Sequence, residues 1–412
     1  MRVVMVARRF WPLSGATEQM LGRLAVGLAA RQCRTTILTA RWHRRWPAEV
    51  AWNGLPVVRL GRPPQGRWQT WRYLRALSGW LRQHGDQFDL VYVWRLGHEA
   101  AAAVQALSGV EGDSPIFADT KIGTVPRPVV LRAERSGRNG DCFRQIDSAC
   151  GRGIKRACLR AAALVAPTPA VRRELEAAGY PRRRIHEIPL GTAALGPRTA
   201  QAQATARGLL AEANAALRLA PWETLTVSTV RLAAGRGWEH LIAAWPAVVR
   251  RWPHARLWLA GEAPGLAAAR QQIESLGLDG KILLVGVFDD MEVLLRAADV
   301  AVVPAVEGAP VALLDAMAAG LPIVATDVPE HRHLAADAAE ALLVPPADAP
   351  ALAAAVDRIL GDPALAAGLL RAAQARAARD FSLAQMVDRH VALFEQLVGT
   401  DSPLALRERG RG

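Results

Sequence analysis

Short runs of apolar, often β-branched residues recur along the whole chain, and segments with helical periodicity separate most of them. This alternation predicts parallel sheets with helices on both faces, because a parallel strand pair needs a long crossover and a helix is its usual form. The first series of runs lies at 1–7, 35–40, 57–60, 90–94, 129–133, 164–168 and 185–189. The second lies at 225–229, 256–261, 282–286, 300–304, 323–326 and 341–345. We therefore expect an α/β fold of two Rossmann-like domains with a cleft between them, where small-molecule sites usually lie.

The domain boundaries follow from the two series of runs. We predict an N-terminal domain over 1–192 and a C-terminal domain over 221–378. The stretch 193–220 is rich in Ala and is interpreted as a linker with an entering helix. Helices are expected near the end of the chain at 349–361, 363–378 and 382–397, before a polar, Arg-rich tail at 399–412.

The charge balance differs between the two halves of the chain. Residues 1–200 contain 32 Lys and Arg against 14 Asp and Glu, whereas residues 201–412 contain 19 against 24. Such asymmetry favours an acidic partner for the first half.

Targeting signals and cysteine usage favour a cytoplasmic setting. No apolar run reaches 18 residues, so no transmembrane helix is expected. The opening apolar segment is too short for a signal peptide and is interpreted as a first strand. The four cysteines show neither C-x-x-C nor zinc spacing, which agrees with a reduced compartment.

The stretch 300–327 is typical of a strand, a loop, a helix and a second strand. VAVVP (300–304) is followed by a turn at 307–310, a helical segment at 311–319, the stop Gly-Leu-Pro and the strand IVAT. Glu307 lies in the loop and Asp315 lies on the helix. Ligands of open α/β sheets bind outside the carboxyl ends of the strands, where this loop is expected. The alternative is an ordinary βαβ unit with a surface acid.

Two arginines follow the strand LTVST (225–229) in a glycine-containing loop. Arg231 and Arg236 are placed to neutralise a diphosphate through charge-assisted, often bidentate hydrogen bonds. The alternative is a solvated surface pair.

The loop FWPLSGATE (10–18) joins the first strand to the first helix. It holds Gly15 and Ala16, and small residues let a backbone approach a ligand closely. Thr17 is expected to act as the N-cap of a helix at 17–31.

Four blocks in this order resemble the retaining glycosyltransferases of family 4, which have the GT-B fold and use nucleotide-sugar donors. The blocks are FWPLSGATE, STVRLAAGRG, LWLAGEAPG with ILLVGVF, and PAVEGAPVALLDAMAAGLPIVATD. The resemblance covers nearly the whole chain, and its last block is the most specific. It implies a GT-B architecture whose C-terminal helices pack back toward the N-terminal domain, with 379–398 as the helix that crosses back.

The resemblance also assigns roles to residues. The family's diphosphate-binding Arg and Lys fall on Arg231 and Arg236, so that Arg replaces Lys. Glu307 matches the acid that contacts the donor sugar, and Asp315 stands where the family has a glutamate that holds the ribose hydroxyls. The other donor-binding candidates are Gly15, Ala16, Val287, Phe288, Gly308, Ala309, Pro310 and Val311.

The first half departs from the family pattern after the run VVLRA (129–133). Many relatives have a histidine there, whereas this chain has LRAERSGRNGD. The acceptor-side candidates in this segment are Arg132, Glu134, Ser136, Arg138 and Asp141. The alternative is an Arg–Glu ion-pair network on a loop.

The chemistry implied is transfer of a hexosyl group with retention from a nucleotide-diphosphate sugar, as co-substrate, to a glycan or lipid-linked acceptor. It belongs to polysaccharide or cell-envelope biosynthesis. No metal is expected, because arginines and helix N-terminal amides stabilise the leaving diphosphate. Apart from the co-substrate no cofactor is expected. The pair His331 and His333 has no third ligand at metal spacing and is interpreted as a surface pair.

A basic amphipathic segment lies at 66–82. Apolar residues, among them Tyr73, Leu77 and Leu81, share one helical face, and arginines lie opposite. Such a helix can lie at an anionic membrane surface, here the inner face of the cytoplasmic membrane, and RWHRRW (41–46) adds to it. The preferred interpretation is that the apolar face packs on the first sheet.

Three other functions compete with the glycosyltransferase. The main alternative is a catalytically inactive, glycosyltransferase-like partner subunit that binds nucleotide or sugar, favoured by Asp315, Arg236 and the missing histidine. Nucleic-acid binding is not expected, because the basic residues are scattered and no binding motif is present. An epimerase on the same fold needs acids between the domains that the sequence does not identify.

Overall fold

The structure is a computed structural model of the chain. It describes all residues except 14, 62–63, 108–126, 135, 138–139, 147–148, 197, 289–290, 307–309 and 402–412. The chain divides into two compact units. Unit 1 holds Met1–Leu13, Thr17–Leu190 and Ala384–Gly412, and unit 2 holds Ser14–Ala16 and Gly191–Leu383.

The described part of unit 1 is built on one eight-stranded sheet in the order β3-β4-β2-β1-β5-β6-β7-β8. Its strands are β1 (Arg2–Val6), β2 (Arg34–Ala40), β3 (Glu49–Trp52), β4 (Leu55–Leu60), β5 (Leu90–Trp94), β6 (Val129–Arg132), β7 (Ala163–Ala166) and β8 (Ile185–Glu187). Neighbouring strands pair in parallel except β3 with β4. The carboxyl ends of the parallel strands therefore share one edge of the sheet.

Strand β3 is absent from the sequence prediction. It pairs antiparallel with β4 through a tight turn at Asn53 and Gly54, both with positive φ (47° and 76°). Asn-Gly between two strands is the strongest short-range hairpin signal, because this turn type needs left-handed backbone at both positions. The signal was present in the sequence.

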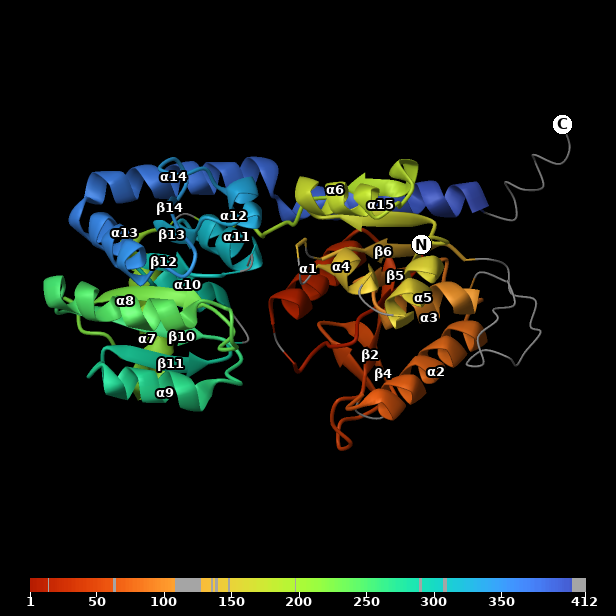
Figure 1. The fold of residues 1–412 in the computed structure, drawn as a ribbon, viewed down its shortest axis with the longest axis horizontal. Coiled ribbons are helices and arrows are strands. Elements are labelled where there is room, and N and C mark those ends of the chain that lie inside the picture. Colours follow the sequence, from red (N-terminus) through yellow and green to blue (C-terminus); the bar gives the residue numbers. More distant parts are fainter. Residues whose placement is uncertain are drawn as a thin grey trace, which may run out of the picture. The chain divides into compact units, whose positions relative to one another are not determined.

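Helices cover both faces of this sheet. They are α1 (Ala16–Ala30), α2 (Arg67–Gln83), α3 (His98–Leu107), α4 (Asp141–Ile146), α5 (Ala149–Cys158), α6 (Pro169–Ala177), the short 3₁₀ turn η1 (Arg182–Arg184) and α15 (Leu383–Asp401). Figure 1 shows α2, α3 and α5 side by side. Leu77 and Leu81 of α2 are fully buried in the core of unit 1. The apolar face of this helix therefore packs against the core, which confirms the preferred interpretation.

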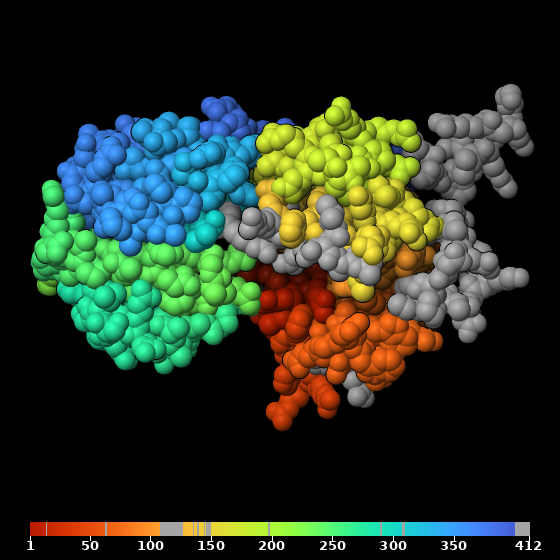
Figure 2. Space-filling model, viewed as in Figure 1, coloured from red at the N-terminus to blue at the C-terminus, as the bar shows by residue number. Residues whose placement is uncertain are grey.

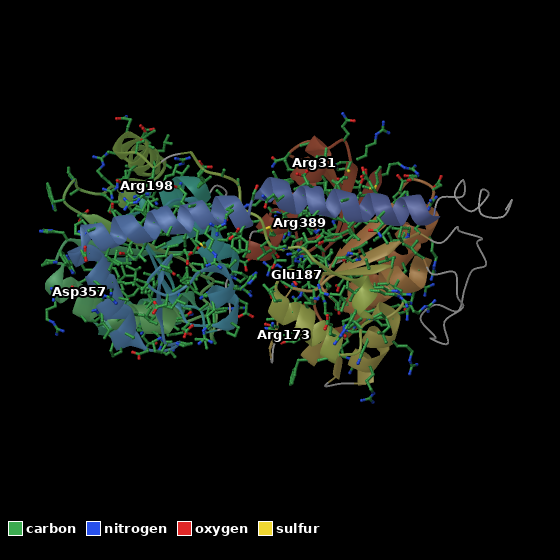
Figure 3. All side chains as sticks on the ribbon, turned by 90° about the horizontal axis from the view of Figure 1, so that it is seen from above. Arg31, Arg173, Glu187, Arg198, Asp357 and Arg389 are labelled. Atoms are coloured by element: carbon green, nitrogen blue, oxygen red, sulfur yellow. The ribbon has the colours of Figure 1, made fainter. Side chains whose placement is uncertain are left out.

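The last helix, α15, packs in unit 1 although it follows unit 2 in the chain. His390 is buried and lies 3.0 Å from the hydroxyl of Tyr92 on β5. Arg31, at the end of α1, forms an ion pair with Asp388, and Figure 3 shows Arg31 beside this helix. The approach is close, because a Cβ atom on Gly27 of α1 would overlap the side chain of Val387.

The described part of unit 2 is built on a second, six-stranded parallel sheet in the order β11-β10-β9-β12-β13-β14. Its strands are β9 (Thr224–Thr229), β10 (Ala255–Ala260), β11 (Ile282–Gly286), β12 (Val300–Val303), β13 (Ile323–Thr326) and β14 (Leu342–Val344). Its helices are α7 (Ala200–Ala213), η2 (Ala215–Leu217), α8 (Trp238–Arg251), α9 (Leu266–Ser275), α10 (Met291–Ala297), α11 (Pro310–Ala318), α12 (Pro329–Leu334), α13 (Ala349–Gly361) and α14 (Pro363–Asp380).

Local sequence signals explain where the last helices of unit 2 begin. The carboxylates of Asp348 and Asp362 cap α13 and α14 by accepting hydrogen bonds from backbone N–H groups of the first turn, and a proline follows each cap. Asp357 of α13, labelled in Figure 3, then ties this helix to α8. It accepts a hydrogen bond from the Trp252 indole (2.9 Å) and pairs with Arg251 (2.8 Å).

The two sheets with their helices confirm the expected α/β class with two Rossmann-like domains. Among the helices of the described residues, none is both long and apolar enough to cross a membrane.

Candidate functional site

The carboxyl edge of the sheet in unit 2 brings two predicted site loops together. Strands β9 and β12 are neighbours and run parallel, with Val300 opposite Thr226 and Ala301 opposite Val227. The loop with Arg231 and Arg236 follows β9, and the segment that begins at Pro304 follows β12. Both therefore leave the sheet at the same edge, on adjacent strands.

Two glycines let the loops of this edge pack backbone against backbone. Gly237 has a φ of 82°, and a Cβ atom there would overlap the carbonyl oxygen of Pro304 and lie 2.7 Å from its carbonyl carbon. Gly261, after β10, is similarly close to Val230. A Cβ atom added at Gly261 would lie 3.0 Å from the carbonyl carbon of Val230. Only glycine fits such positions, since it adds no side chain and accepts a positive φ.

An acid from the neighbouring strand orients the first arginine. The side chain of Arg231 is about half exposed and its Nε lies 3.1 Å from Oε2 of Glu262, which follows β10. The loops are also joined by the Leu232 N–H, which donates to the carbonyl of Glu262 (2.8 Å). Arg236 is half-buried. Glu262 lies within the block LWLAGEAPG, but nothing in that block indicates its contact with Arg231.

The loop that contains the predicted sugar-binding acid lies partly outside the described residues. This holds for Glu307, Gly308 and Ala309. Pro310 begins α11, so its missing N–H falls where the helix has no internal partner for it. Val311 follows and is buried.

Asp315 is buried on α11 and is held by a residue far away in the chain. One of its carboxylate oxygens accepts a hydrogen bond from the hydroxyl of Thr192 (3.1 Å). Thr192 is in turn fixed by backbone hydrogen bonds to Phe381 (2.8 Å) and from Leu383 (2.9 Å). Sequence reasoning missed Thr192, because 123 residues separate it from Asp315.

The predicted base-flanking residues follow the edge strand β11. Val287 is 49% exposed and Phe288 is half-buried. A large apolar side chain that remains half exposed at the carboxyl edge is available for contact with a flat ligand group.

The acceptor-side candidates gather at the carboxyl edge of the sheet in unit 1. Glu134 follows β6, and its backbone N–H donates to the carboxylate of Asp141 at the start of α4 (2.6 Å). Arg95, at the end of β5, pairs with Glu134 (3.0 Å) and approaches Asp141 (3.7 Å). Ser136 is half-buried on the same loop, and Arg138 lies outside the described residues.

Arg95 is the residue of this edge that sequence reasoning missed. Its φ is 82°, which is uncommon for a residue with a side chain and marks backbone held in place by its surroundings. Burial alone would lower the pKa of Arg95, but the carboxylates of Glu134 and Asp141 raise it above its ordinary value. Glu134 and Asp141 therefore form the ion-pair network of the alternative interpretation, and Arg95 is its basic partner.

Arg132 has a different environment from the other acceptor-side candidates. It is 1% exposed, and its guanidinium lies over the ring of Trp94 at 4.5 Å. Its Nε and Nη1 atoms have no hydrogen-bond partner within the described part of the chain. The ring face supplies a cation–π contact but does not satisfy these donors.

Two local expectations are wrong. Thr17 does not precede the first helix, since α1 begins at Ala16 directly after Gly15, and its hydroxyl donates to the carboxylate of Glu134 instead. His331 is not on the surface, because it is fully buried and its Nδ1 lies 2.7 Å from the carbonyl oxygen of Thr326. Within the residues that the structure describes, no three His, Cys, Asp or Glu side chains gather as metal ligands would.

Two family models match the chain, one in each unit. Residues 17–193 match the model described as Glycosyltransferase Family 4, and residues 224–362 match the model described as Glycosyl transferases group 1.

Among curated proteins, an exopolysaccharide phosphotransferase of Streptomyces coelicolor is 32% identical over 46% of this chain and 21% of that protein. A phosphatidyl-myo-inositol mannosyltransferase of Mycolicibacterium smegmatis is 34% identical over 35% of this chain and 38% of that protein. The matched part spans less than half the length of these relatives.

Solved structures resemble the chain over nearly its full length. The Anabaena protein HepE in complex with UDP and glucose matches with a TM-score of 0.73 at 19% identity, over 95% of this chain and 99% of that one. Sucrose-phosphate synthase from Thermosynechococcus elongatus matches with a TM-score of 0.76 at 21% identity, over 97% and 99%. At these identities the likeness establishes the GT-B fold.

Proposed function

Because the chain belongs to the family 4 and group 1 glycosyltransferases, we propose that it transfers a hexosyl group, with retention, from a nucleotide-diphosphate sugar to a glycan or lipid-linked acceptor. The oxygen of the acceptor hydroxyl forms the new glycosidic bond while the bond from the anomeric carbon to the diphosphate oxygen breaks, and the hydroxyl proton passes to the departing diphosphate. The observation that carries this proposal is the packing of the Arg231 loop against Pro304 at the carboxyl edge of unit 2.

In this proposal the diphosphate leaves against fixed positive charge. Arg231, oriented by Glu262, and Arg236 bind its oxygens, together with backbone N–H groups in the first turn of α11. Charge that is already in place at the leaving group lowers the barrier without reorganisation, so the reaction needs no metal for that purpose. The structure of HepE with UDP and glucose supports a nucleotide-sugar as the donor.

Glu307 positions the sugar and stabilises positive charge that develops at the anomeric carbon. We do not assign it as a nucleophile, because a double displacement needs a carboxylate under the sugar ring. Asp315 holds the ribose hydroxyls, and Thr192 keeps its carboxylate in place. Val287 and Phe288 flank the base.

The acceptor is proposed to bind unit 1 at the edge that carries Glu134, Asp141 and Arg95. The excess of Lys and Arg over Asp and Glu in residues 1–200 suits an anionic or lipid-linked acceptor. The relative named as a phosphatidyl-myo-inositol mannosyltransferase supports the lipid-linked form. We place the reaction in the cytoplasm, in polysaccharide or cell-envelope biosynthesis.

One observation favours a second candidate, an inactive partner subunit that only binds nucleotide or sugar. Asp315 has a shorter side chain than the glutamate of the family, and one of its oxygens is already engaged by Thr192. A ribose contact then depends on the remaining acceptor capacity of this carboxylate.

The test combines labelled donors with two variants of Glu307. Glu307→Ala and the isosteric Glu307→Gln should abolish transfer. When no acceptor is present, both variants should also abolish the slow background hydrolysis of the donor. Thermal unfolding should stay unchanged in both. Transfer should persist in EDTA, and NMR of the product should show the anomeric configuration of the donor. Unchanged turnover in both variants would remove Glu307 from the site. Neither transfer nor hydrolysis by the wild type, with nucleotide still bound, would favour the inactive subunit.

A further inference from the structure

Tryptophan and arginine residues collect at one part of the carboxyl edge of the sheet in unit 1. Strands β4, β2 and β1 are neighbours, so the segments after them leave the sheet side by side. The segment after β1 carries Trp11, that after β2 carries Trp42 and Trp46, and that after β4 leads into α2 with Trp68 and Trp71. We name residues 8–13, 41–48 and 64–75 the Trp/Arg surface.

A buried arginine holds two of these segments together. Arg59 of β4 lies between the rings of Trp11 (5.6 Å) and Trp46 (5.3 Å). Its guanidinium donates to the carbonyl oxygens of Pro47 (3.2 Å) and Trp11 (3.1 Å). The Trp42 indole adds a bond to the carbonyl of Arg8 (2.8 Å). Arg8 also donates to the hydroxyl of Thr70 on α2 (2.9 Å), so the surface is an ordered structure that joins all three segments.

The first turns of α2 expose the aromatic part of this surface. Trp68 is 63% exposed and stacks on Trp71, with 4.8 Å between ring centroids and 17° between planes. Arg75 lies over Trp71 at 5.6 Å. On the other face of the helix, Leu77 and Leu81 pack in the core of unit 1. The two indoles therefore lie outside this core. Figure 2 shows the segment of α2, in orange, at the surface of unit 1.

The charge around these indoles is of one sign. Residues 50–85 contain six arginines and no acid, and the loop 41–48 contains three arginines and no acid. Glu49 is the only acidic residue between Glu18 and Asp86. The exposed basic side chains of the Trp/Arg surface are His43, Arg44, Arg45, Arg67, Arg72 and Arg75.

From this arrangement we propose that the Trp/Arg surface docks unit 1 on an anionic lipid surface. Exposed indoles favour the level of the lipid headgroups, because they have an apolar body and a polar N–H, and nearby arginines pair with anionic headgroups. The rings of Trp68 and Trp71 cover one face of each other, which leaves less ring surface for stacking on nucleobases. The docking element is thus the first turns of α2 with the preceding loops. The apolar face of α2 that contains Leu77 and Leu81 does not contact the lipid, because it packs in the core.

This inference rests on the proposed function and narrows its acceptor to the lipid-linked form. In the sheet order β4-β2-β1-β5-β6, the docking strands adjoin the strands that end at Arg95 and Glu134. Neighbouring strands lie about 4.8 Å apart, so β4, which leads into the docking helix, and β6 are separated by about 19 Å. A lipid-linked sugar that extends about that far from the docked helix reaches the acceptor-side residues.

The test is co-sedimentation of the full chain with vesicles of phosphatidylcholine alone and of phosphatidylcholine mixed with phosphatidylglycerol. We expect binding to the mixed vesicles that weakens with added salt. The double variant Arg67→Glu/Arg72→Glu should weaken this binding at least about thirty-fold, since each arginine near an anionic membrane contributes about a factor of five. Both positions are exposed and lie in the first two turns of α2, where acidic residues suit the helix dipole, so the fold is kept. Trp68→Ala should weaken the binding as well.

Matched controls come from unit 2. Trp222 is 66% exposed, and Arg270 and Arg371 are exposed on α9 and α14. Trp222→Ala and Arg270→Glu/Arg371→Glu repeat the same chemical changes away from the docking surface and should leave binding unchanged. Equal binding to both vesicle types, or α2 variants that bind like their controls, would overturn the proposal. So would α2-dependent binding to an oligonucleotide or a soluble anionic polysaccharide without binding to vesicles.

Calorimetric titration with UDP separates this inference from the function on which it rests. The α2 variants should bind UDP as the wild type does, because the nucleotide residues lie in unit 2. Vesicle binding without any nucleotide binding would refute the proposed function alone. Donor-dependent transfer without vesicle binding would refute the docking surface alone.

Discussion

A pair of glycine substitutions tests whether the two loops of the donor site must touch. Gly237 and Gly235 lie in the same loop, both with positive φ (82° and 74°). A Cβ atom on Gly237 would lie 2.7 Å from the carbonyl carbon of Pro304 and overlap its oxygen, whereas a Cβ atom on Gly235 would meet nothing within 4 Å. Gly235→Ala is therefore a matched control for the cost of left-handed backbone, about 1 kcal/mol in each variant.

The steric part of the cost falls on Gly237→Ala alone. Ordinary contact for a Cβ atom begins at 3.4 Å, so the carbonyl carbon must move away by at least 0.7 Å, the difference from 2.7 Å, and the overlap with the oxygen demands more. This movement separates the loop with Arg231 from the segment that leads to Glu307. A misplacement of about 1 Å at a reacting centre costs about a hundred-fold in rate.

We expect Gly237→Ala to lower transfer by about a hundred-fold and to weaken UDP binding clearly, while Gly235→Ala retains both. The measurements are turnover of labelled donor and calorimetric titration with UDP, with thermal unfolding to show that each variant is folded. If Gly237→Ala bound UDP as tightly as Gly235→Ala, the close packing of these loops would not matter for the site, and the reasoning from geometry would fail.

Two further predictions concern Thr192 and His390. Thr192→Val removes a hydrogen bond to the buried carboxylate of Asp315 and should lower the free energy of unfolding by about 1.5–3 kcal/mol. Thr192→Ser keeps the hydroxyl and should retain most of this free energy of unfolding. Equal thermal stability of the two variants would contradict the role of the hydrogen bond from Thr192 to Asp315. Burial lowers the pKa of His390 to about 3, so the unfolded chain binds a proton there first as the pH falls. Stability should therefore decline as the pH falls from about 6.5 toward 3. In thermal unfolding measured across this pH range, His390→Gln should show a smaller decline. The same pH profile in the variant and the wild type would exclude His390 as the source of the decline.

Much of the fold could be predicted, because its signals are local. Parallel strands such as β5 and β13 are buried on both faces and therefore consist of unbroken apolar runs. The hairpin strand β3 escaped because it is only four residues long and alternates between exposed and half-buried positions, although the Asn53–Gly54 turn marked it.

The site residues that were missed act through partners far away in the chain. Glu262 gains its role from Arg231 on the adjacent strand, and Thr192 gains its role from Asp315. At Thr17 a local signal predicted the wrong contact. The sequence predicts an N-cap there, but the Thr17 hydroxyl donates to the carboxylate of Glu134, 117 residues away. Periodicity and turn chemistry contain no information about such contacts, because these depend on the order of strands in the sheet.

The measurement that tests the central claim most directly is calorimetric titration with UDP, GDP and ADP, with and without Mg²⁺, on the wild type and on Arg231→Ala. We predict that one nucleotide binds tightly without Mg²⁺. Loss of a guanidinium that bonds to a charged group should weaken this binding by about 1.5–3 kcal/mol, or roughly ten- to a hundred-fold. Arg270→Glu, on an exposed part of α9, should bind like the wild type. Absence of binding by all three nucleotides, or binding that Arg231→Ala leaves unchanged, would contradict a donor site at the carboxyl edge of unit 2.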